Sequence, residues 1–171
     1  MLIQSTFEAS LDRIGEHTVL VQETIFPAEV ETLSHSPYRP EYAWLFTVER
    51  RLGRILDPWL RQYRDRIIGP DGLLSEALSN AYCHGHRRNP TLGIDLRVVV
   101  GKFGILVSIV DSGDGFDHRE IARNVTRKKN YYHNSGRGLY RMLTEECFQV
   151  FYTQQGRAFN LLHITDAHGR E

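Results

Sequence analysis

The sequence predicts an α+β fold in which helices pack on one face of a sheet. Apolar residues recur at helical spacing in three segments, and runs rich in apolar and β-branched residues mark five strands. These segments follow one another in the order strand, helix, helix, hairpin, loop, helix, hairpin. Paired hairpins with segregated helices favour a two-layer sandwich with a mixed, mostly antiparallel sheet.

The length and composition are those of one domain. The chain has 171 residues, of which 41% are hydrophobic, and this is enough for a sizeable core. We expect a single domain over residues 1–171. Residues 1–16 and 166–171 are predicted to be tails.

The N-terminal half predicts one strand and two helices. The run of residues 19–26 is apolar and β-branched, and Pro27 closes it. Helical spacing over residues 45–59 predicts an amphipathic helix that is kinked or broken at Pro58. A second helix is predicted to start with Asp71 as its cap. Its apolar face consists of Leu74, Ala77, Leu78 and Ala81.

The C-terminal half predicts two hairpins with a helix between them. The first hairpin turns at Gly101–Gly104 and the second at residues 155–156. The helix follows Gly138 and reaches about Glu146. The predicted strands are residues 94–100, 105–110, 148–152 and 159–164.

Charge and hydropathy narrow the range of partners. Lys plus Arg and Asp plus Glu both number 21, so the net charge is zero and does not favour binding to nucleic acid or membrane. The N-terminus lacks a basic region followed by an apolar run, and no segment approaches the ~20 apolar residues of a membrane span. We therefore expect a cytoplasmic protein, with Cys83 and Cys147 as reduced thiols.

The first chemical motif is Glu76-Ala-Leu-Ser-Asn80-Ala81. Glu76 and Asn80 are four residues apart, so on a helix they share one face. A carboxylate and an amide oxygen on that face suit a base and a ligand for hydrated Mg²⁺. An exposed helix pair without a ligand is the alternative interpretation of this motif alone.

The second motif is Asp111-Ser-Gly113-Asp-Gly115, at the exit of a predicted strand. The Asp111 carboxylate can accept a hydrogen bond from the exocyclic amine of a base. Gly113 and Gly115 permit positive φ and the close approach of a flat base. The same pattern is also a common turn sequence.

The third motif is Ser135-Gly136-Arg137-Gly138-Leu139. Its two glycines precede an apolar helical run, so their backbone amides are expected to face phosphates at a helix N-terminus. Arg137 lies between them and is a candidate phosphate contact. A plain loop before a helix is the alternative.

Together the three motifs resemble the N, G1 and G2 boxes of the GHKL (Bergerat-fold) ATPases. The resemblance implies ATP or ADP with Mg²⁺ as ligands and a Bergerat-type two-layer sandwich. Glu76 would be the general base, Asn80 would bind Mg²⁺ and Asp111 would read adenine. The pockets for base and phosphate would be shaped by Gly113, Gly115, Ser135, Gly136, Arg137 and Gly138, with Leu139 packed beneath them and His84 packed or hydrogen-bonded near the N box.

The run from Asn80 to Gly85 brings the chain close to one branch, the bacterial anti-sigma-factor serine/threonine kinases. Such proteins hold a sigma factor inactive and phosphorylate a STAS-type anti-anti-sigma partner, and they commonly form homodimers. One departure is the final hairpin, where the usual Gly-x-Gly-Thr turn is replaced by Gly156-Arg157-Ala158-Phe159.

Two other functions remain open from the sequence. A regulatory module of the same fold would bind ATP weakly or not at all and act by docking to a partner, and the Ala158-Phe159 departure favours this alternative. The ATP-binding half of a two-component histidine kinase would need a phospho-acceptor histidine on a separate helix, and the sequence contains no convincing one.

Overall fold

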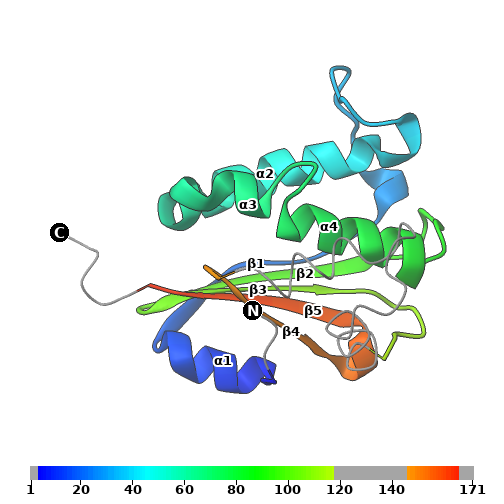
Figure 1. Cartoon of the computed structure of the whole chain (residues 1–171). Helices are drawn as coiled ribbons and strands as arrows, with labels where there is room; N and C mark the ends of the chain where they lie inside the picture. Colours follow the sequence, from blue (N-terminus) through cyan, green and yellow to red (C-terminus); the bar gives the residue numbers. More distant parts are fainter. Residues whose placement is uncertain (1–3, 118–145, 166–171) are drawn as a thin grey trace.

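The computed structural model describes residues 4–117 and 146–165, and in them a five-stranded antiparallel sheet is covered by helices (Figure 1). The strand order is β1-β2-β3-β5-β4, and each neighbouring pair is antiparallel. This confirms the α+β sandwich that the element order predicts. The strands are β1 (His17–Ile25), β2 (Ile94–Gly101), β3 (Gly104–Val110), β4 (Gln149–Thr153) and β5 (Ala158–Ile164).

One helix layer covers the upper face of the sheet in Figure 1. Apolar residues of these helices and of the sheet form the main core, with Leu52, Leu74 and Leu78 fully enclosed. Burial of such side chains stabilises the fold by about 1.5–3 kcal/mol each. The layer consists of α2 (Ala43–Leu60), α3 (Arg64–Ile67) and α4 (Leu73–Asn80). The connections before, between and after these helices contain the short helices η1 (Pro27–Glu29), η2 (Pro40–Tyr42), η3 (Arg61–Tyr63) and η4 (Ala81–Gly85). A further short helix, η5 (Gln154–Gly156), forms the turn between β4 and β5.

Two helix boundaries differ from the sequence prediction. Helix α2 runs through Pro58 and ends two residues later, so proline does not break it at that position. Helix α4 is preceded by Gly72 as its N-cap residue, and Asp71 is not the cap. A Cβ on Gly72 would overlap the backbone of Ile67 and Ile68, so close backbone packing sets this helix start.

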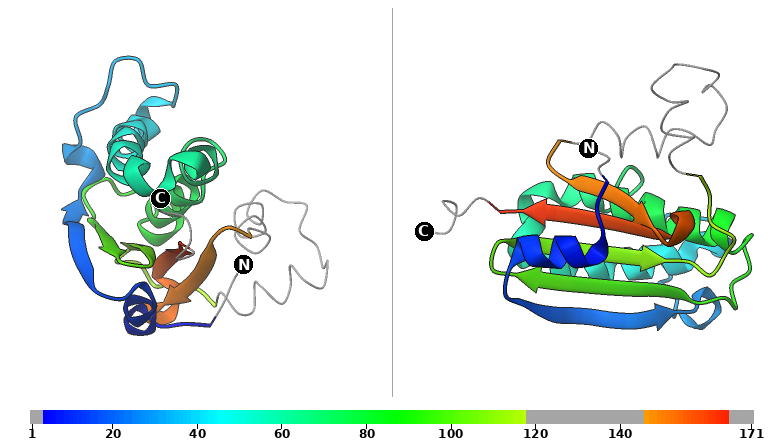
Figure 2. Two further views of the ribbon diagram at one scale, coloured as in Figure 1. Left: turned by 90° about the vertical axis from the view of Figure 1, so that its left-hand side faces the viewer. Right: turned by 90° about the horizontal axis from the view of Figure 1, so that it is seen from below.

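The prediction of a tail over residues 1–16 is wrong for its helical part. Residues Phe7–Ile14 form α1, which packs beneath the sheet on the face opposite the helix layer (Figure 2). The Thr6 side chain caps the helix by accepting a hydrogen bond from the Ala9 amide at 3.1 Å. Ile14 is fully buried in a second small core, because spacing of three and four residues aligns Phe7, Leu11 and Ile14 on one face.

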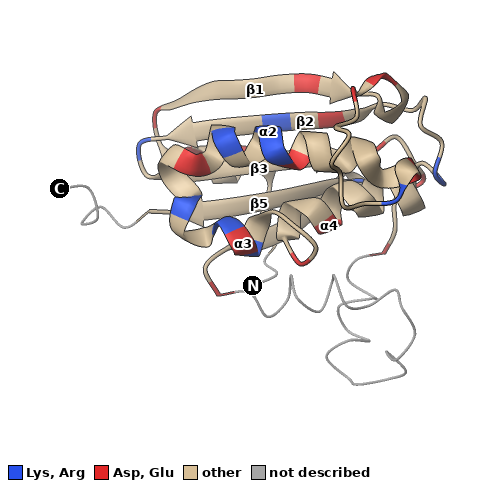
Figure 3. Ribbon diagram, turned by 90° about the horizontal axis from the view of Figure 1, so that it is seen from above, with Lys and Arg blue, Asp and Glu red and all other residues tan. Residues whose placement is uncertain are grey.

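The outer surface of the helix layer carries mixed charge. Basic and acidic residues are interspersed along the ribbons of α2 and α3 (Figure 3). Within residues 4–117 and 146–165, no helix is both long enough and apolar enough to cross a lipid bilayer.

Candidate functional site

Helix α4 presents two polar residues beside its buried face. Leu74, Ala77 and Leu78 pack into the core, which leaves Glu76 and Asn80 half-buried one turn apart. The Asn80 Nδ2 donates a hydrogen bond to Glu76 Oε1 at 3.2 Å. This bond leaves the Asn80 amide oxygen as the end available to a cation.

The strand β3 places Asp111 directly after its last residue. The Asp111 Oδ1 accepts a hydrogen bond from the Gly113 amide at 2.8 Å, and the Asp111 amide donates to the Arg157 carbonyl at 3.1 Å. Burial raises the pKa of the Asp111 carboxyl, against the smaller opposing effects of the Gly113 amide, His86 and Arg157. The Asp111 backbone is therefore tied to the residue before β5, whereas its carboxyl is held by the Gly113 amide and partly shielded from water.

A single turn of π-helix, η4, continues α4 and brings Gly85 against Asp111. A Cβ on Gly85 would overlap Cγ and Oδ1 of Asp111. π-Helical turns inside helices occur frequently at functional sites. Glycine at this position therefore lets the first and second motifs meet.

The glycines of the second motif also lie against backbone. A Cβ on Gly113 would overlap the Gly85 carbonyl oxygen, and Gly115 has φ of +75°, where a side chain would overlap the Gln155 carbonyl oxygen. The Phe116 amide donates to the same Gln155 carbonyl at 3.1 Å. The loop after β3 is thus fastened both to η4 and to the β4–β5 turn.

His86 is a structural member of the site that the sequence analysis did not assign. Its Nε2 lies 3.1 Å from both the Ser112 amide, which donates to it, and the Ser112 hydroxyl. The side chain is only 2% exposed, and burial lowers its pKa, although the Asp111 charge acts in the opposite direction. A neutral His86 accepting from Ser112 therefore anchors the loop that carries Asp111.

The motif residues surround one cavity of about 400 Å³. Such a volume is typical of small-molecule sites, which span roughly 300–1,000 Å³. Its walls come from α4, η4, the ends of β3, β4 and β5, and the loop after β3. Of the described site residues predicted from the sequence, Asn80, His84, Asp111 and Gly115 line the cavity, whereas Glu76 and Gly113 do not.

Two predicted residues have different positions relative to this cavity. His84 is exposed at its rim, whereas the buried histidine of the same segment is His86. Glu76 does not line the cavity and is connected to it through its hydrogen bond from Asn80.

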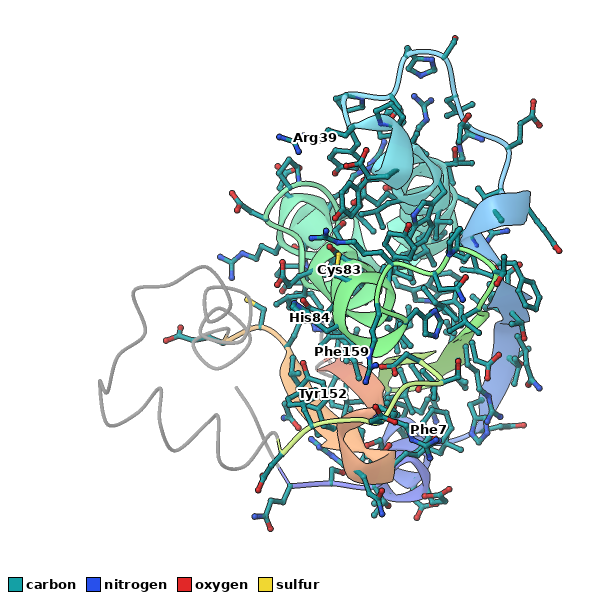
Figure 4. The ribbon with its side chains drawn as sticks, turned by 90° about the vertical axis from the view of Figure 1, so that its right-hand side faces the viewer. Phe7, Arg39, Cys83, His84, Tyr152 and Phe159 are labelled. Carbon is teal, nitrogen blue, oxygen red and sulfur yellow. The ribbon has the colours of Figure 1, made fainter. Side chains whose placement is uncertain are left out.

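An aromatic wall, formed by Phe116, Tyr152 and Phe159, closes one side of the cavity. The ring centroid of Tyr152 lies 5.0 Å from that of Phe116 and 5.8 Å from that of Phe159, and both contacts are edge-to-face. Figure 4 shows Tyr152 and Phe159 below His84, between the hairpin and η4. The hairpin register pairs Tyr152 with Phe159, so their shared face could have been predicted from the strand pattern.

A comparison with protein families identifies the kind of domain that carries this cavity. The histidine kinase-like ATPase domain family matches residues 73–162, which include the first two motifs and the aromatic wall. The chain belongs to the histidine kinase-like ATPase domain family. A comparison with curated proteins gives no match.

Membership of the histidine kinase-like ATPase family supports binding of ATP with Mg²⁺, and the cavity fits these ligands. Asp111 supplies a partly buried acceptor for an amine, and Gly85 keeps a side chain away from its carboxyl. Asn80 and Glu76 supply oxygen atoms, which Mg²⁺ prefers. The donor set therefore matches both ends of a magnesium nucleotide.

The third motif of this histidine kinase-like ATPase lies outside the described residues. It comprises Ser135, Gly136, Arg137, Gly138 and Leu139, whose predicted contact with phosphates stays a prediction. The structure does describe Phe159, where the sequence departs from the expected Gly-x-Gly-Thr turn. Its side chain, 4% exposed, forms part of the cavity wall where the resemblance leads one to expect a threonine.

Proposed function

We propose that the chain is an ATP-dependent protein serine/threonine kinase that also acts as an anti-sigma factor. Its substrate would be a serine or threonine of a STAS-type anti-anti-sigma protein. The observation that supports this most is the convergence of Asn80 and Asp111 on one cavity, with Glu76 hydrogen-bonded behind Asn80.

Each residue has a definite task in the proposed transfer. Asp111 would hold the nucleotide by accepting a hydrogen bond from its exocyclic amine. Asn80 would hold Mg²⁺ through its amide oxygen, and the bound Mg²⁺ would neutralise phosphate charge. Glu76 would orient Asn80 and accept the proton of the attacking hydroxyl. Phosphoryl transfer asks the protein mainly for such positioning and charge stabilisation.

The experiment uses radiolabelled ATP and a purified STAS-type partner. Label should appear on the partner with the wild-type chain and fall by roughly 10²–10⁴-fold with Glu76→Gln, as expected for loss of a general base. Nucleotide affinity should remain close to that of the wild type. Equal labelling by Glu76→Gln would show that Glu76 is not the base.

A second candidate function is a docking module that regulates a partner without phosphorylating it. The specific observation in its favour is Phe159, whose ring occupies cavity wall in place of the expected threonine. This function predicts that the chain binds its partner while no label is transferred. The same radiolabel experiment, combined with a pull-down of the partner, separates the two functions.

A further inference from the structure

One cationic side chain beside Asp111 has no task in the proposed phosphoryl transfer. Arg157 lies between η5 and β5 and lines the cavity of the first two motifs, which we call the nucleotide cavity. Its backbone carbonyl accepts a hydrogen bond from the Asp111 amide at 3.1 Å. Arg157 is therefore the cross-strand neighbour of the residue that would hold the base of the nucleotide.

The side chains of Arg157 and Asp111 lie on the same face of the sheet. Arg157 comes two residues before Phe159, and Asp111 comes two residues after Ile109. Phe159 and Ile109 are paired in the ladder between β3 and β5, and both line the nucleotide cavity. Side chains two positions apart in a strand point the same way, so Arg157 and Asp111 continue this pair along the cavity wall.

The stem of the Arg157 side chain is held in place, whereas its terminal nitrogen atoms are open. Nε donates to the Gln154 carbonyl at 3.2 Å, and Cγ packs over Gly115, where an added Cβ would lie 3.2 Å away. Neither Nη atom has an acceptor among the described residues. Arg157 is half-buried, and none of its atoms is among the buried polar atoms that lack a partner. A ligand in the cavity can therefore reach the Nη atoms.

Arg157 and Asp111 carry opposite charges without pairing with each other. The Asp111 Oδ1 accepts from the Gly113 amide at 2.8 Å, and no ion pair joins the described side chains of Asp111 and Arg157. Burial raises the pKa of the Asp111 carboxyl, and the Arg157 charge is among the smaller effects that oppose this rise. A ligand that reaches both groups thus meets a hydrogen-bond acceptor next to a charged donor.

The edge of adenine matches this pair of groups. Its exocyclic amine donates a hydrogen bond, and the neighbouring ring nitrogen N1 accepts one. Guanine carries a carbonyl oxygen and an N1–H group on the same edge, so its acceptor would face Asp111 and its donor would face Arg157. Phe116 and Phe159 also line the cavity, but their rings carry no donor for N1.

We propose that Arg157 determines the base specificity of the nucleotide site by donating a hydrogen bond to N1 of adenine. The inference rests on the proposed function, in which Asp111 accepts from the amine of the same base. A base with C–H in place of N1 presents an apolar edge to the guanidinium and loses this bond, so it binds more weakly. Arg157 thereby adds a second point of contact to the one at Asp111.

The test titrates the purified chain calorimetrically, with Mg²⁺ present, against ADP and against 1-deaza-ADP, in which a C–H group replaces N1. The wild type should bind ADP about tenfold or more tightly than 1-deaza-ADP. Arg157→Met should bind ADP as weakly as the wild type binds 1-deaza-ADP, and its affinity for 1-deaza-ADP should be unchanged. A melting temperature close to that of the wild type checks that the variant is folded.

The matched control is Arg87→Met, which removes the other arginine of the same cavity. Arg87 lines the cavity, but its Nη2 is paired with Asp114 Oδ2 at 3.1 Å. This variant should keep the wild-type ratio between the affinities for ADP and 1-deaza-ADP.

Two results would overturn the inference and leave the proposed function standing. One is equal affinity of the wild type for ADP and 1-deaza-ADP. The other is an effect of Arg157→Met that is the same for both nucleotides, from no change to complete loss, because Arg157 would then not act through N1. Absence of ADP binding by the wild type would instead contradict the proposed function and this inference together.

Discussion

At the scale of single residues, the nucleotide site depends on close approach between segments that are distant in sequence. Gly85 lies against the Asp111 carboxyl, and Gly113 lies against the Gly85 carbonyl. His86 then holds the loop by accepting from Ser112. Asp111 is therefore positioned mainly by backbone contacts, and small changes there should affect binding more than they affect folding.

Gly85→Ala should weaken ADP binding at least tenfold, which corresponds to about 1.4 kcal/mol. The new Cβ would overlap Cγ and Oδ1 of Asp111, so the carboxyl must move away from its position. Calorimetric titration with ADP measures the effect. The matched control is Gly53→Ala, where the nearest atoms belong to the flexible end of Arg64, and its ADP affinity should be that of the wild type. Equal affinity in both variants would contradict this role of Gly85.

His86 should make stability depend on pH. Because burial lowers its folded-state pKa below the usual value of about 6.5, the unfolded chain binds its proton first as pH falls. The contribution of His86 to stability is complete above about pH 6.5 and is lost as pH falls below this value. His86→Gln stays neutral, so its melting temperature should fall less than that of the wild type over this range.

The control for this pH dependence is His84→Gln, which removes an exposed histidine from the same segment. Its melting temperature should follow the wild-type curve. Parallel curves for wild type and His86→Gln would show that His86 is not the group responsible. The raised pKa of Asp111 has the opposite effect, because above the unfolded-state pKa of this carboxyl it makes stability rise as pH falls. Asp111 is present in all three proteins, so this effect is common to them.

At the scale of elements, α1 is an integral part of the fold. Ile14→Ala should lower the free energy of unfolding by about 2–5 kcal/mol, because it removes a fully buried side chain from the second core. Urea denaturation measures this change. The control Leu92→Ala removes a 38% exposed side chain and should change stability by less than about 0.5 kcal/mol. A similarly small effect of Ile14→Ala would contradict the contribution of α1 to stability and would support the prediction of a tail.

The sequence allowed most elements of the described fold to be predicted, because they carry strong periodicity. The β2–β3 hairpin and helix α2 follow their apolar patterns closely. Helix α1 was missed because its apolar residues are few and its burial comes from the sheet, which is a tertiary effect. The start of α4 was misplaced because backbone packing at Gly72 outweighs the capping preference of Asp71.

Site residues with a recognisable local spacing could be predicted from the sequence. Residues that meet only through the fold could not. Asn80 and Asp111 were found because a carboxamide on a helix and a carboxylate at a strand end have recognisable spacing. His86 could not be distinguished from His84, since only the three-dimensional contact with Ser112 makes one of them structural. The pairing of Tyr152 with Phe159 could have been predicted from the hairpin pattern, whereas the contact of Phe116 with Tyr152 comes only from the fold.

At the scale of the whole molecule, one sheet separates two cavities, and strand β5 contributes to both. Phe159 lines the nucleotide cavity, whereas its neighbour Asn160 lines a second cavity beside α1. Successive strand residues point to opposite faces of the sheet, so β5 supplies side chains to both cavities.

Strand β1 forms an edge of the described sheet and suggests a homodimer interface. Val19 and Leu20 are each 40% exposed on it, and exposed apolar edges favour pairing with another chain. Light scattering should give about twice the chain mass of 19.8 kDa. A Val19→Lys/Leu20→Lys double variant should give a single-chain mass. A wild-type mass of one chain would remove the proposed dimer.

We propose that the first two motifs form a magnesium-dependent adenine nucleotide site. Calorimetric titration with ADP and with a non-hydrolysable ATP analogue, each with and without Mg²⁺, tests it most directly. Wild type should bind more tightly with Mg²⁺, Asn80→Ala should lose the magnesium dependence, and Asp111→Asn should weaken binding with and without the metal. Absence of binding by the wild-type chain under every condition would contradict the claim.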